Sequence, residues 1–223
     1  LVREGREVMP SFQGYVRKDG KVGTRNYVAI IPSVVCSVEV VEAIVANTVM
    51  TQGIIHHQGC CQTPPDLERI TDCLIKICEN PNVGAALIVS LGCEGVDTNR
   101  LEAAARATGK PIERINIQEL GGTSAAIAAG INAAQRLVMA ISGLQRETVD
   151  MSRFVMGIKC GASDTTSGVA SNPVIGYVAD RIVDLGGTVI FGETTEFIGA
   201  EHILQRRAKN PHVASEIARI VTE

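Results

Sequence analysis

The sequence alternates four times between a short apolar run and a longer segment with apolar residues at helical spacing. The first run, YVAIIPSVV at 27–35, is β-branched and continuously apolar, which is typical of a strand buried on both faces. Three further runs follow as GIIHH at 53–57, GAALIVSLG at 84–92 and IERINI at 112–117. Strands that alternate with helices favour a parallel sheet. We therefore expect an α/β fold of three layers, with helices on both faces of a parallel sheet.

The segments between these runs predict helices at 37–48, 64–80, 97–110 and 121–142. Ser37 is a candidate N-cap for the first of them. The helix at 64–80 begins with Pro-Pro, which suits a first helical turn. Its apolar residues share one face, and they are Leu67, Ile70, Leu74, Ile77 and Cys78. Upstream, GYVRKDGKVGTRN is rich in glycine and basic residues, which favours a loop.

The chain turns polar at GLQRETVDMSR, residues 143–153, which indicates a domain boundary. We expect a lead-in at 1–11, a central α/β domain at 12–148 and the N-terminal part of a C-terminal α/β domain at 149–223. In that last part FVMGIKC and TVIFGE predict strands, GASDTTSGVASNP a loop, and the remainder helices. Two strands do not make an independently stable domain, so we expect this domain to be truncated.

Composition excludes several classes of function. Basic residues do not cluster, the net charge is −3, and aromatic residues make up 3% of the chain, which argues against nucleic-acid partners. We find no run of the roughly 18 apolar residues that a membrane span needs, so we expect a cytoplasmic protein. Seven cysteines without a C-x-x-C pair predict free thiols, metal ligands or nucleophiles rather than disulfides, a zinc ribbon or a thioredoxin-like site.

Reactive side chains collect where the expected strands end. In open parallel sheets, ligands bind outside the carboxyl ends of the strands. A cysteine stands at four of the five strand ends considered, two of them beside a histidine or a carboxylate. These candidates are Cys36, His57, Cys60, Cys93, Glu94, Lys159 and Cys160.

Each candidate also has a structural interpretation. Cysteine is often buried as a small apolar residue, and we expect this of Cys73 and Cys78 on the apolar face of the helix at 64–80. His57 could be a structural histidine and Lys159 a solvated strand end. Glu94 is harder to explain by packing, because a carboxylate after a buried strand needs a donor, a metal or water.

Three familiar motifs are absent. No G-x-G-x-x-G follows the first strand, so a nicotinamide site is unsupported. DGKVGT lacks the spacing of a phosphate-binding loop. SLGCEG is similar to the nucleophile elbow of cysteine hydrolases, but Leu91 stands where a glycine is required.

Four blocks of the sequence resemble the altronate dehydratase/galactarate dehydratase family, to which the large subunit of sulfolactate sulfo-lyase is related. They are GYVRKDGKVGTRNYVAIIPSVVCS, HHQGCCQ, NPNVGAALIVSLGCE and IKCGASDTTSGVASNPVIG with LGGTVIFGETTEFIGAE. The blocks run from Gly14 to Glu201. Two departures from the family's pattern, Cys61 and Ala162 in place of glycine, remove no reactive group.

The resemblance implies a larger protein with a β-rich N-terminal domain before this chain and more of the C-terminal domain after it. It implies loss of water from a sugar acid to give a 2-keto-3-deoxy acid, assisted by a divalent metal. Fe(II) is the first choice, ahead of an iron–sulfur cluster. The expected partners are a small sugar acid and further copies of the chain in a homo-oligomer, without nucleic acid or membrane.

For the site, the resemblance leads us to expect three groups of residues. The catalytic candidates are His57, Lys159, Glu196 and Asp164, with Glu193 competing with Glu196. The metal candidates are Cys60, Cys93 and Glu94, since thiolate and carboxylate together suit iron. The substrate-binding candidates are Arg25, Asn26, Ser163, Thr166, Ser167 and Asn172. Three alternatives stay open: a sulfolactate-type lyase, a hydrolase with Cys93 as nucleophile beside His57, and a non-catalytic ligand-binding fragment.

Overall fold

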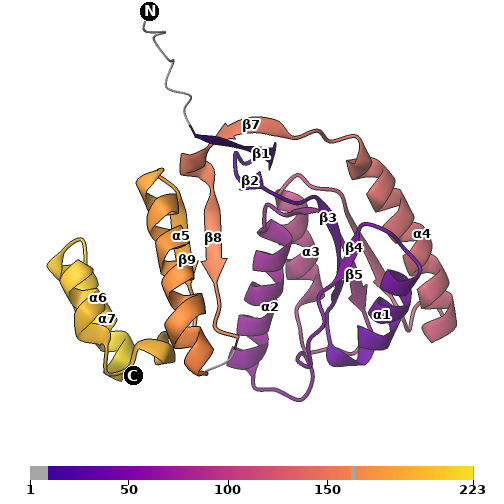
Figure 1. Ribbon diagram of the computed structural model, residues 1–223. Coiled ribbons are helices and arrows are strands. Elements are labelled where there is room, and N and C mark those ends of the chain that lie inside the picture. The colour runs from indigo at the N-terminus through magenta and orange to yellow at the C-terminus, as the bar shows by residue number, and fades with distance from the viewer. Residues whose placement is uncertain (1–9, 162–163, 223) are drawn as a thin grey trace, which may run out of the picture. The chain divides into compact units, whose positions relative to one another are not determined.

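A computed structural model describes residues 10–161 and 164–222 (Figure 1). Its contacts divide the chain into two compact units, one covering Ser11–Val149 and the other beginning at Asp150. Each unit is described by itself.

The first unit is built on a parallel sheet of four strands in the order β4-β3-β5-β6. The strands are β3 (Tyr27–Pro32), β4 (Thr51–Gly53), β5 (Val83–Ser90) and β6 (Ile112–Asn116). Every pair is parallel, and β3 and β5 stay in register from Val28 opposite Ala85 to Pro32 opposite Val89. All eight residues of β5 are buried, as expected for a central strand covered on both faces.

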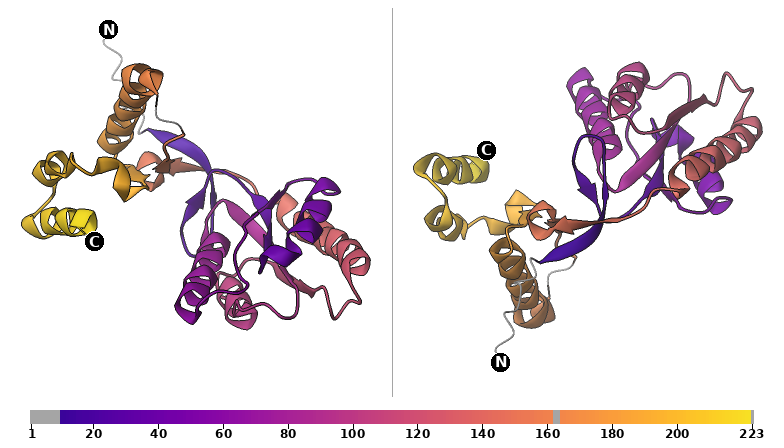
Figure 2. Two further views of the ribbon diagram at one scale, coloured as in Figure 1. Left: turned by 90° about the horizontal axis from the view of Figure 1, so that it is seen from below. Right: turned by 90° about the horizontal axis from the view of Figure 1, so that it is seen from above.

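Helices cover both faces of this sheet, and the predicted three-layer α/β fold is confirmed (Figure 1). On one face α1 (Val38–Ala46) and α4 (Thr123–Ser142) pack against Ile30 and Leu87. On the other face α2 (Pro64–Glu79) and α3 (Thr98–Ala107) pack against Ile31 and Ile88. Figure 2 shows the two helix layers, one on each face of the sheet, from below and from above. Adjacent strand residues serve opposite cores because side chains alternate across a strand.

The thiols of α2 divide between the core and the surface. Cys78 is fully buried, as predicted, and burial raises the pKa of its thiol to about 11. Cys73 is exposed, so the prediction that it packs in the core is wrong. Cys73 lies one residue before the buried Leu74, on the edge of the apolar face of α2. The residues of α2 that are buried form a narrower stripe than the apolar face expected from the sequence, so Cys73 remains in solvent.

The segment expected to be a loop at 14–26 is instead largely a hairpin. Strand β1 (Ser11–Val16) pairs antiparallel with the short β2 (Val22–Gly23), and β7 (Glu147–Asp150) lies on the other side of β1. The polar segment at 143–153 therefore contains a strand that the sequence did not predict. Gly23 must be glycine here, because a Cβ would lie 2.2 Å from the carbonyl oxygen of Pro81.

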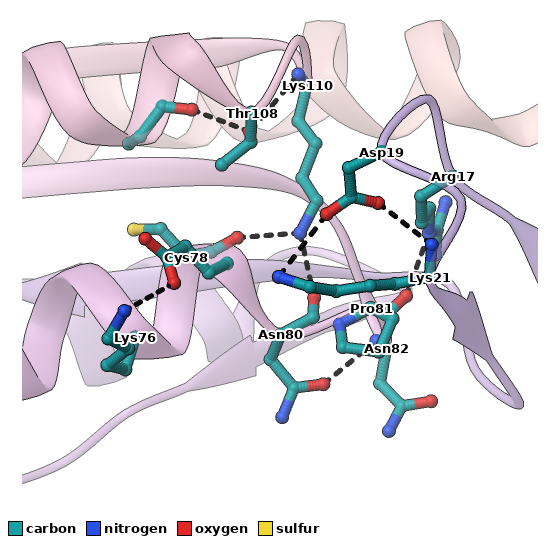
Figure 3. Close-up of polar contacts among 12 residues, drawn as sticks. Arg17, Asp19, Lys21, Lys76, Cys78, Asn80, Pro81, Asn82, Thr108 and Lys110 are labelled. Carbon is teal, nitrogen blue, oxygen red and sulfur yellow. Dashed lines mark hydrogen bonds and ion pairs between the residues drawn. The ribbon is translucent and has the colours of Figure 1, made fainter. Parts of the chain in front are cut away.

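A polar network fixes the amino ends of the strands (Figure 3). The Lys110 ammonium, in the loop before β6, donates to the carbonyl oxygens of Cys78 and Asn80 at 2.6 and 2.8 Å. These carbonyls belong to the C-terminal end of α2, where a cation is favourable. The Arg17 guanidinium donates to Pro81 O at 2.7 Å. The network thereby connects α2 and β1 to the loops that lead into β5 and β6.

Helix α4 is long and apolar enough, by length and composition, to cross a membrane, although the sequence analysis found no such stretch. Its side chains Ala126, Ala133, Leu137 and Ile141 are buried in the core on the sheet. Core helices of soluble proteins meet the same criterion, so this feature is weak evidence for a membrane span.

The second unit contains a parallel pair, β8 (Val155–Ile158) and β9 (Thr188–Phe191), joined by α5 (Asn172–Asp184). A short 3₁₀ turn (Met151–Arg153) precedes β8, and after β9 come a 3₁₀ turn (Thr194–Phe197), α6 (Glu201–Arg207) and α7 (Pro211–Thr222). The loop expected at 161–173 is wrong over its second half, because Ser167–Ser171 forms a π-helical turn that runs into α5. In α5 Ile182 is the buried residue, whereas Tyr177 of the same helix and Phe191 of β9 are exposed.

Candidate active site

The segment 54–63 carries the chain from β4 across the carboxyl end of β3 to α2. The strand expected at 53–57 is wrong, since β4 ends at Gly53. Backbone bonds hold the segment instead: Gln58 O accepts from Val35 N at 2.9 Å, and Gly59 O accepts from Gly95 N at 3.1 Å. These bonds tie it to the residues that follow β3 and β5, so the ends of three neighbouring strands meet here.

Gly59 allows this close approach. Its φ is +98°, and a Cβ there would lie 2.6 Å from Ser33 O and 3.0 Å from Val34 Cα. Both the conformation and the space exclude a side chain. The glycine therefore sets the position of the histidines before it and of the thiols after it.

The two adjacent histidines have different roles in the structure. His56 is half-buried, its Nε2–H donates to Pro32 O at 2.8 Å, and its Nδ1 accepts from Gln58 N at 3.2 Å. Both ring nitrogens are used, so His56 holds the segment on the end of β3. His57 is exposed, and its ring makes no hydrogen bond or ion pair with any residue that the structure describes. The imidazole of His57 is the one available to a ligand.

Four thiols gather around this edge. The Sγ atoms of Cys60 and Cys61 are 3.5 Å apart. The Cys61 thiol raises the pKa of the Cys60 thiol, and Cys36 and Cys93 are near enough to add to the effect. All four are exposed, so the packing interpretation holds for none of them. Cys93 accepts a weak bond from Gln118 Nε2 at 3.7 Å.

Glu94 is held in place by both carboxylate oxygens. Its Oε1 accepts from the Oγ of the fully buried Ser33 at 2.9 Å, and its Oε2 accepts from Gly92 N at 2.6 Å. Each oxygen of a carboxylate has two acceptor sites, so one remains on each. The carboxylate is thus fixed in orientation and still able to bind a ligand or a metal.

A polar cavity of about 220 Å³ lies beside Glu94, at the carboxyl ends of β5 and β6. It is lined by Ser90, Gly92, Glu94, Val96, Thr98, Asn99, Arg114, Asn116 and Glu119. Of this set, only Glu94 was predicted from the sequence. Asn116 could have been found, since it ends β6 and a polar residue at the end of a strand is the signal that singled out Glu94.

In the second unit, the predicted Lys159 follows β8 and forms an ion pair with Glu193, which follows β9. Lys159 Nζ lies 2.7 Å from Glu193 Oε1, and Glu193 Oε2 accepts from Cys160 N at 3.2 Å. The bond to Glu193 raises the pKa of Lys159 and lowers the pKa of Glu193. Glu193 has a left-handed backbone at φ 60°. Of the two competing glutamates, Glu193 is the one that pairs with Lys159, whereas Glu196 is exposed in the next turn.

Asp164 begins the helical segment that leads into α5. Its carboxylate accepts from Thr166 Oγ1 at 2.5 Å and from Ser167 N at 2.9 Å, and the Thr166 bond is the main cause of its lowered pKa. Three predicted substrate-binding residues, Asp164 aside, lie along this start: Thr166, Ser167 and Asn172. Ser163 lies outside the described residues.

Arg25 and Asn26 lie elsewhere. They precede β3, at the amino end of the central sheet, whereas His57, Cys60, Cys93 and Glu94 lie at its carboxyl end. Asn26 is buried and donates to Ile141 O at 3.0 Å, while its Oδ1 accepts from Arg17 Nη1 at 2.9 Å. Asn26 therefore stabilises the fold, and the structure does not bring Arg25 and Asn26 to the four candidates at the carboxyl end of the central sheet.

The predicted metal ligands fit a soft divalent metal in kind. Thiolates of Cys60 and Cys93 and a hydrogen-bonded carboxylate are donors that suit iron. Among residues 10–161 and 164–222, however, no group of three His, Cys, Asp or Glu side chains is placed to hold a metal ion as it stands. The ligand set therefore stays a prediction.

At the carboxyl ends of its parallel strands, where ligands bind in such sheets, this α/β chain carries a free imidazole, thiols and an oriented carboxylate. The chain belongs to the D-galactarate dehydratase/altronate hydrolase family. The second domain of that family matches residues 14–142, and the D-galactarate/altronate dehydratase C-terminal domain matches residues 151–223. The resemblance drawn from the sequence is confirmed.

Three relatives illustrate the range of the family. The (2R)-sulfolactate sulfo-lyase subunit beta of Chromohalobacter salexigens is 38% identical over 203 residues, covering 91% of this chain and 51% of the relative. The altronate dehydratase of Bacillus subtilis is 30% identical, covering 96% of this chain and 44% of the relative. The galactarate dehydratase (L-threo-forming) of Escherichia coli is 33% identical, covering 93% and 43%. The chain thus spans about half the length of these relatives.

Proposed function

We propose that this chain is part of a lyase that removes water from a sugar acid of the altronate or galactarate type, giving a 2-keto-3-deoxy acid. The observation that carries the proposal is that an exposed His57 ring and an oriented Glu94 carboxylate lie at the same carboxyl edge of the parallel sheet. The names of two relatives, altronate dehydratase and galactarate dehydratase, support the reaction class.

The reaction begins with removal of the weakly acidic proton on the carbon next to the substrate carboxylate. A positioned base is needed for that proton, and an acid is needed for the departing β-hydroxyl. We assign the base to His57, because its ring nitrogens carry no other bond in the described part of the chain. We assign the acid to Lys159, because its ammonium can donate a proton and is held in place by Glu193 at 2.7 Å.

The remaining assignments follow the chemistry of the side chains. Fe(II), held by Cys60, Cys93 and Glu94, would supply Lewis-acid stabilisation of the negative charge that develops on the substrate carboxylate. Glu193 holds Lys159, and Glu196 adds to the negative charge around it. The substrate hydroxyls would be bound by Ser163, Asp164, Thr166, Ser167 and Asn172. Arg25 and Asn26 are left out of the proposed site because of their place at the opposite edge.

A sulfolactate-type lyase is the second candidate, favoured by the 38% identity to the sulfo-lyase subunit. It would use the same proton abstraction, with sulfite in place of hydroxide as the leaving group. A cysteine hydrolase gains no support from the site, since no hydrogen bond joins His57 to Cys93 in the described residues.

The test uses the protein that contains this chain, purified without air and assayed with altronate, galactarate and sulfolactate, with and without added Fe(II). We expect a 2-keto-3-deoxy acid from one sugar acid, and loss of product on chelation. His57→Ala should lower turnover by about a hundredfold or more, whereas His212→Ala, on the exposed start of α7, should not.

Two outcomes would overturn the proposal. Sulfite release from sulfolactate alone would favour the second candidate. No product from any acid, together with rapid alkylation of Cys93, would favour the hydrolase.

A further inference from the structure

We propose that the polar cavity at the ends of β5 and β6 binds the uncharged hydroxyl tail of a sugar acid, and that it selects a monoacid such as altronate over a diacid such as galactarate. The proposal rests on the proposed function for the class of ligand. It concerns residues that neither the sequence nor the proposed reaction assigned, chiefly Asn99, Asn116 and Glu119.

Two amide groups offer unused donors to this cavity. Asn99 Oδ1 accepts from Arg114 Nη1 at 2.9 Å. Asn116 Oδ1 accepts from the backbone N–H groups of Gln118 and Glu119 at 3.1 and 3.2 Å. These bonds assign the oxygen of each amide and leave its NH₂ group without an acceptor in the described part of the chain. Two fixed NH₂ groups on the wall of one cavity suit the hydroxyl oxygens of a polyol.

The charges around the cavity disfavour a second anionic group. Arg114 is the one cation among the lining residues, and its Nε lies 3.1 Å from Glu102 Oε2, on a carboxylate that Arg106 also binds at 2.7 Å. Glu94 and Glu119 add two carboxylates to the lining. Without a bound metal the lining therefore carries one positive and two negative side chains, and a ligand carboxylate inside would meet a net negative charge. A hydroxyl group can instead donate to the Glu119 carboxylate, which has no partner in the described residues.

The volume fits a short polyol chain. The cavity of about 220 Å³ holds roughly seven waters at the ~30 Å³ each occupies in the liquid, or a few hydroxymethylene units. Glu94 lines the cavity and also lies at the thiol edge. A sugar acid whose reacting carbons meet that edge therefore extends its tail into the cavity.

Calorimetric titration of the protein that contains this chain, freed of metal, with altronate and galactarate tests this. We expect altronate to bind at least about tenfold more tightly, because only the diacid places a carboxylate inside the net negative cavity. Asn116→Asp keeps the oxygen that holds the two backbone amides and removes the donor, so altronate should bind about tenfold more weakly.

Glu119→Gln removes one of the two repelling charges. Galactarate should then bind at least about threefold more tightly than before, while the affinity for altronate should change by less than that. Asn47→Ala, an exposed residue at the end of α1 that lines no part of the cavity, serves as the control and should change neither affinity.

Galactarate binding as tight as altronate, or an affinity ratio unchanged in both variants, would overturn the inference. Binding needs no turnover, so the two proposals fail separately. Selective altronate binding without any lyase product overturns the proposed function and leaves the cavity assignment standing. Lyase activity without a difference between the two acids does the reverse.

Discussion

Replacing Asn26 by alanine distinguishes a structural residue from a substrate ligand. The side chain is 7% exposed, and it links Arg17 Nη1 at 2.9 Å to Ile141 O at 3.0 Å. The substitution leaves a partly buried guanidinium N–H and a buried carbonyl without a partner. A hydrogen bond to a charged group contributes about 1.5–3 kcal/mol and a neutral one about 0.5–1.5 kcal/mol. We therefore expect the unfolding free energy of the first unit to fall by about 3 kcal/mol.

Amide hydrogen exchange read by mass spectrometry is the assay. Peptides from β3 and β5 report the opening of the central sheet, and about 3 kcal/mol corresponds to a loss of roughly two orders of magnitude in their protection. Asn47→Ala is the matched control, since its amide is exposed and donates only to Ala43 O. Its effect should stay within about 0.5 kcal/mol.

The reasoning is refuted if Asn26→Ala changes protection by less than about fivefold, or about 1 kcal/mol. If ligand binding is lost at the same time, the substrate-binding role expected from the sequence is correct and the structural role is not.

Three further predictions concern other parts of the chain. Gly59→Ala should lower the free energy of unfolding of the first unit by about 1–3 kcal/mol and change the alkylation rate of Cys60. Gly143→Ala, where a Cβ would meet open space, should do neither. Equal unfolding curves for the two variants would contradict this. Burial lowers the pKa of Lys110 to about 8, so the folded chain loses this proton before the unfolded one, and the free energy of unfolding should rise from about pH 8 to about 10.4. We expect this pH-dependent rise to be roughly 1 kcal/mol, because Lys110 is partly exposed, and we expect Lys110→Met to remove it. Urea denaturation followed by circular dichroism measures the unfolding free energy at each pH. The same pH dependence in the wild-type protein and the variant would refute the prediction. Glu193→Gln should lower the pKa of Lys159, as checked by the NMR titration of ¹³C-methylated lysines, and an unshifted titration would show that the ion pair is absent in solution.

The sheet and its helices could be predicted because their sequence signals are local and repeated. A strand such as β5 is apolar at every position because both faces are covered, and α2 shows its buried face by spacing. The hairpin of β1 and β2 escaped prediction because glycine and basic residues dominate it and its pairing holds only two residues of β2. β4 was misplaced because Ile54 and Ile55 look like strand residues, while the pairing with β3 covers Thr51–Gly53.

The candidate site was predictable only as far as strand ends reveal it. Arg25 and Asn26 were expected to bind substrate, but they precede β3 rather than follow it, so they lie at the other edge of the sheet. The preference for Glu193 over Glu196 depends on the left-handed turn at Glu193, which no residue pattern announces. Asn116 ends β6 and shows the strand-end signal, whereas Asn99 lies in the first turn of α3, where no strand end marks it.

The adjacent histidines show why the two ends of the sheet play different parts. At the amino end, Arg17, Asn26 and Lys110 use their polar groups on carbonyls and side chains of the fold, so their mutation should alter stability first. At the carboxyl end, His56 uses both ring nitrogens to hold the segment after β4 in place. The ring of His57 is therefore not needed to hold this segment. A histidine with both nitrogens bound cannot accept a substrate proton without giving up a contact that holds the segment. The proposed reaction therefore depends on His56 remaining bound. Loss of either ring should lower turnover by about a hundredfold or more, but only loss of His56 should also increase hydrogen exchange in residues 54–63.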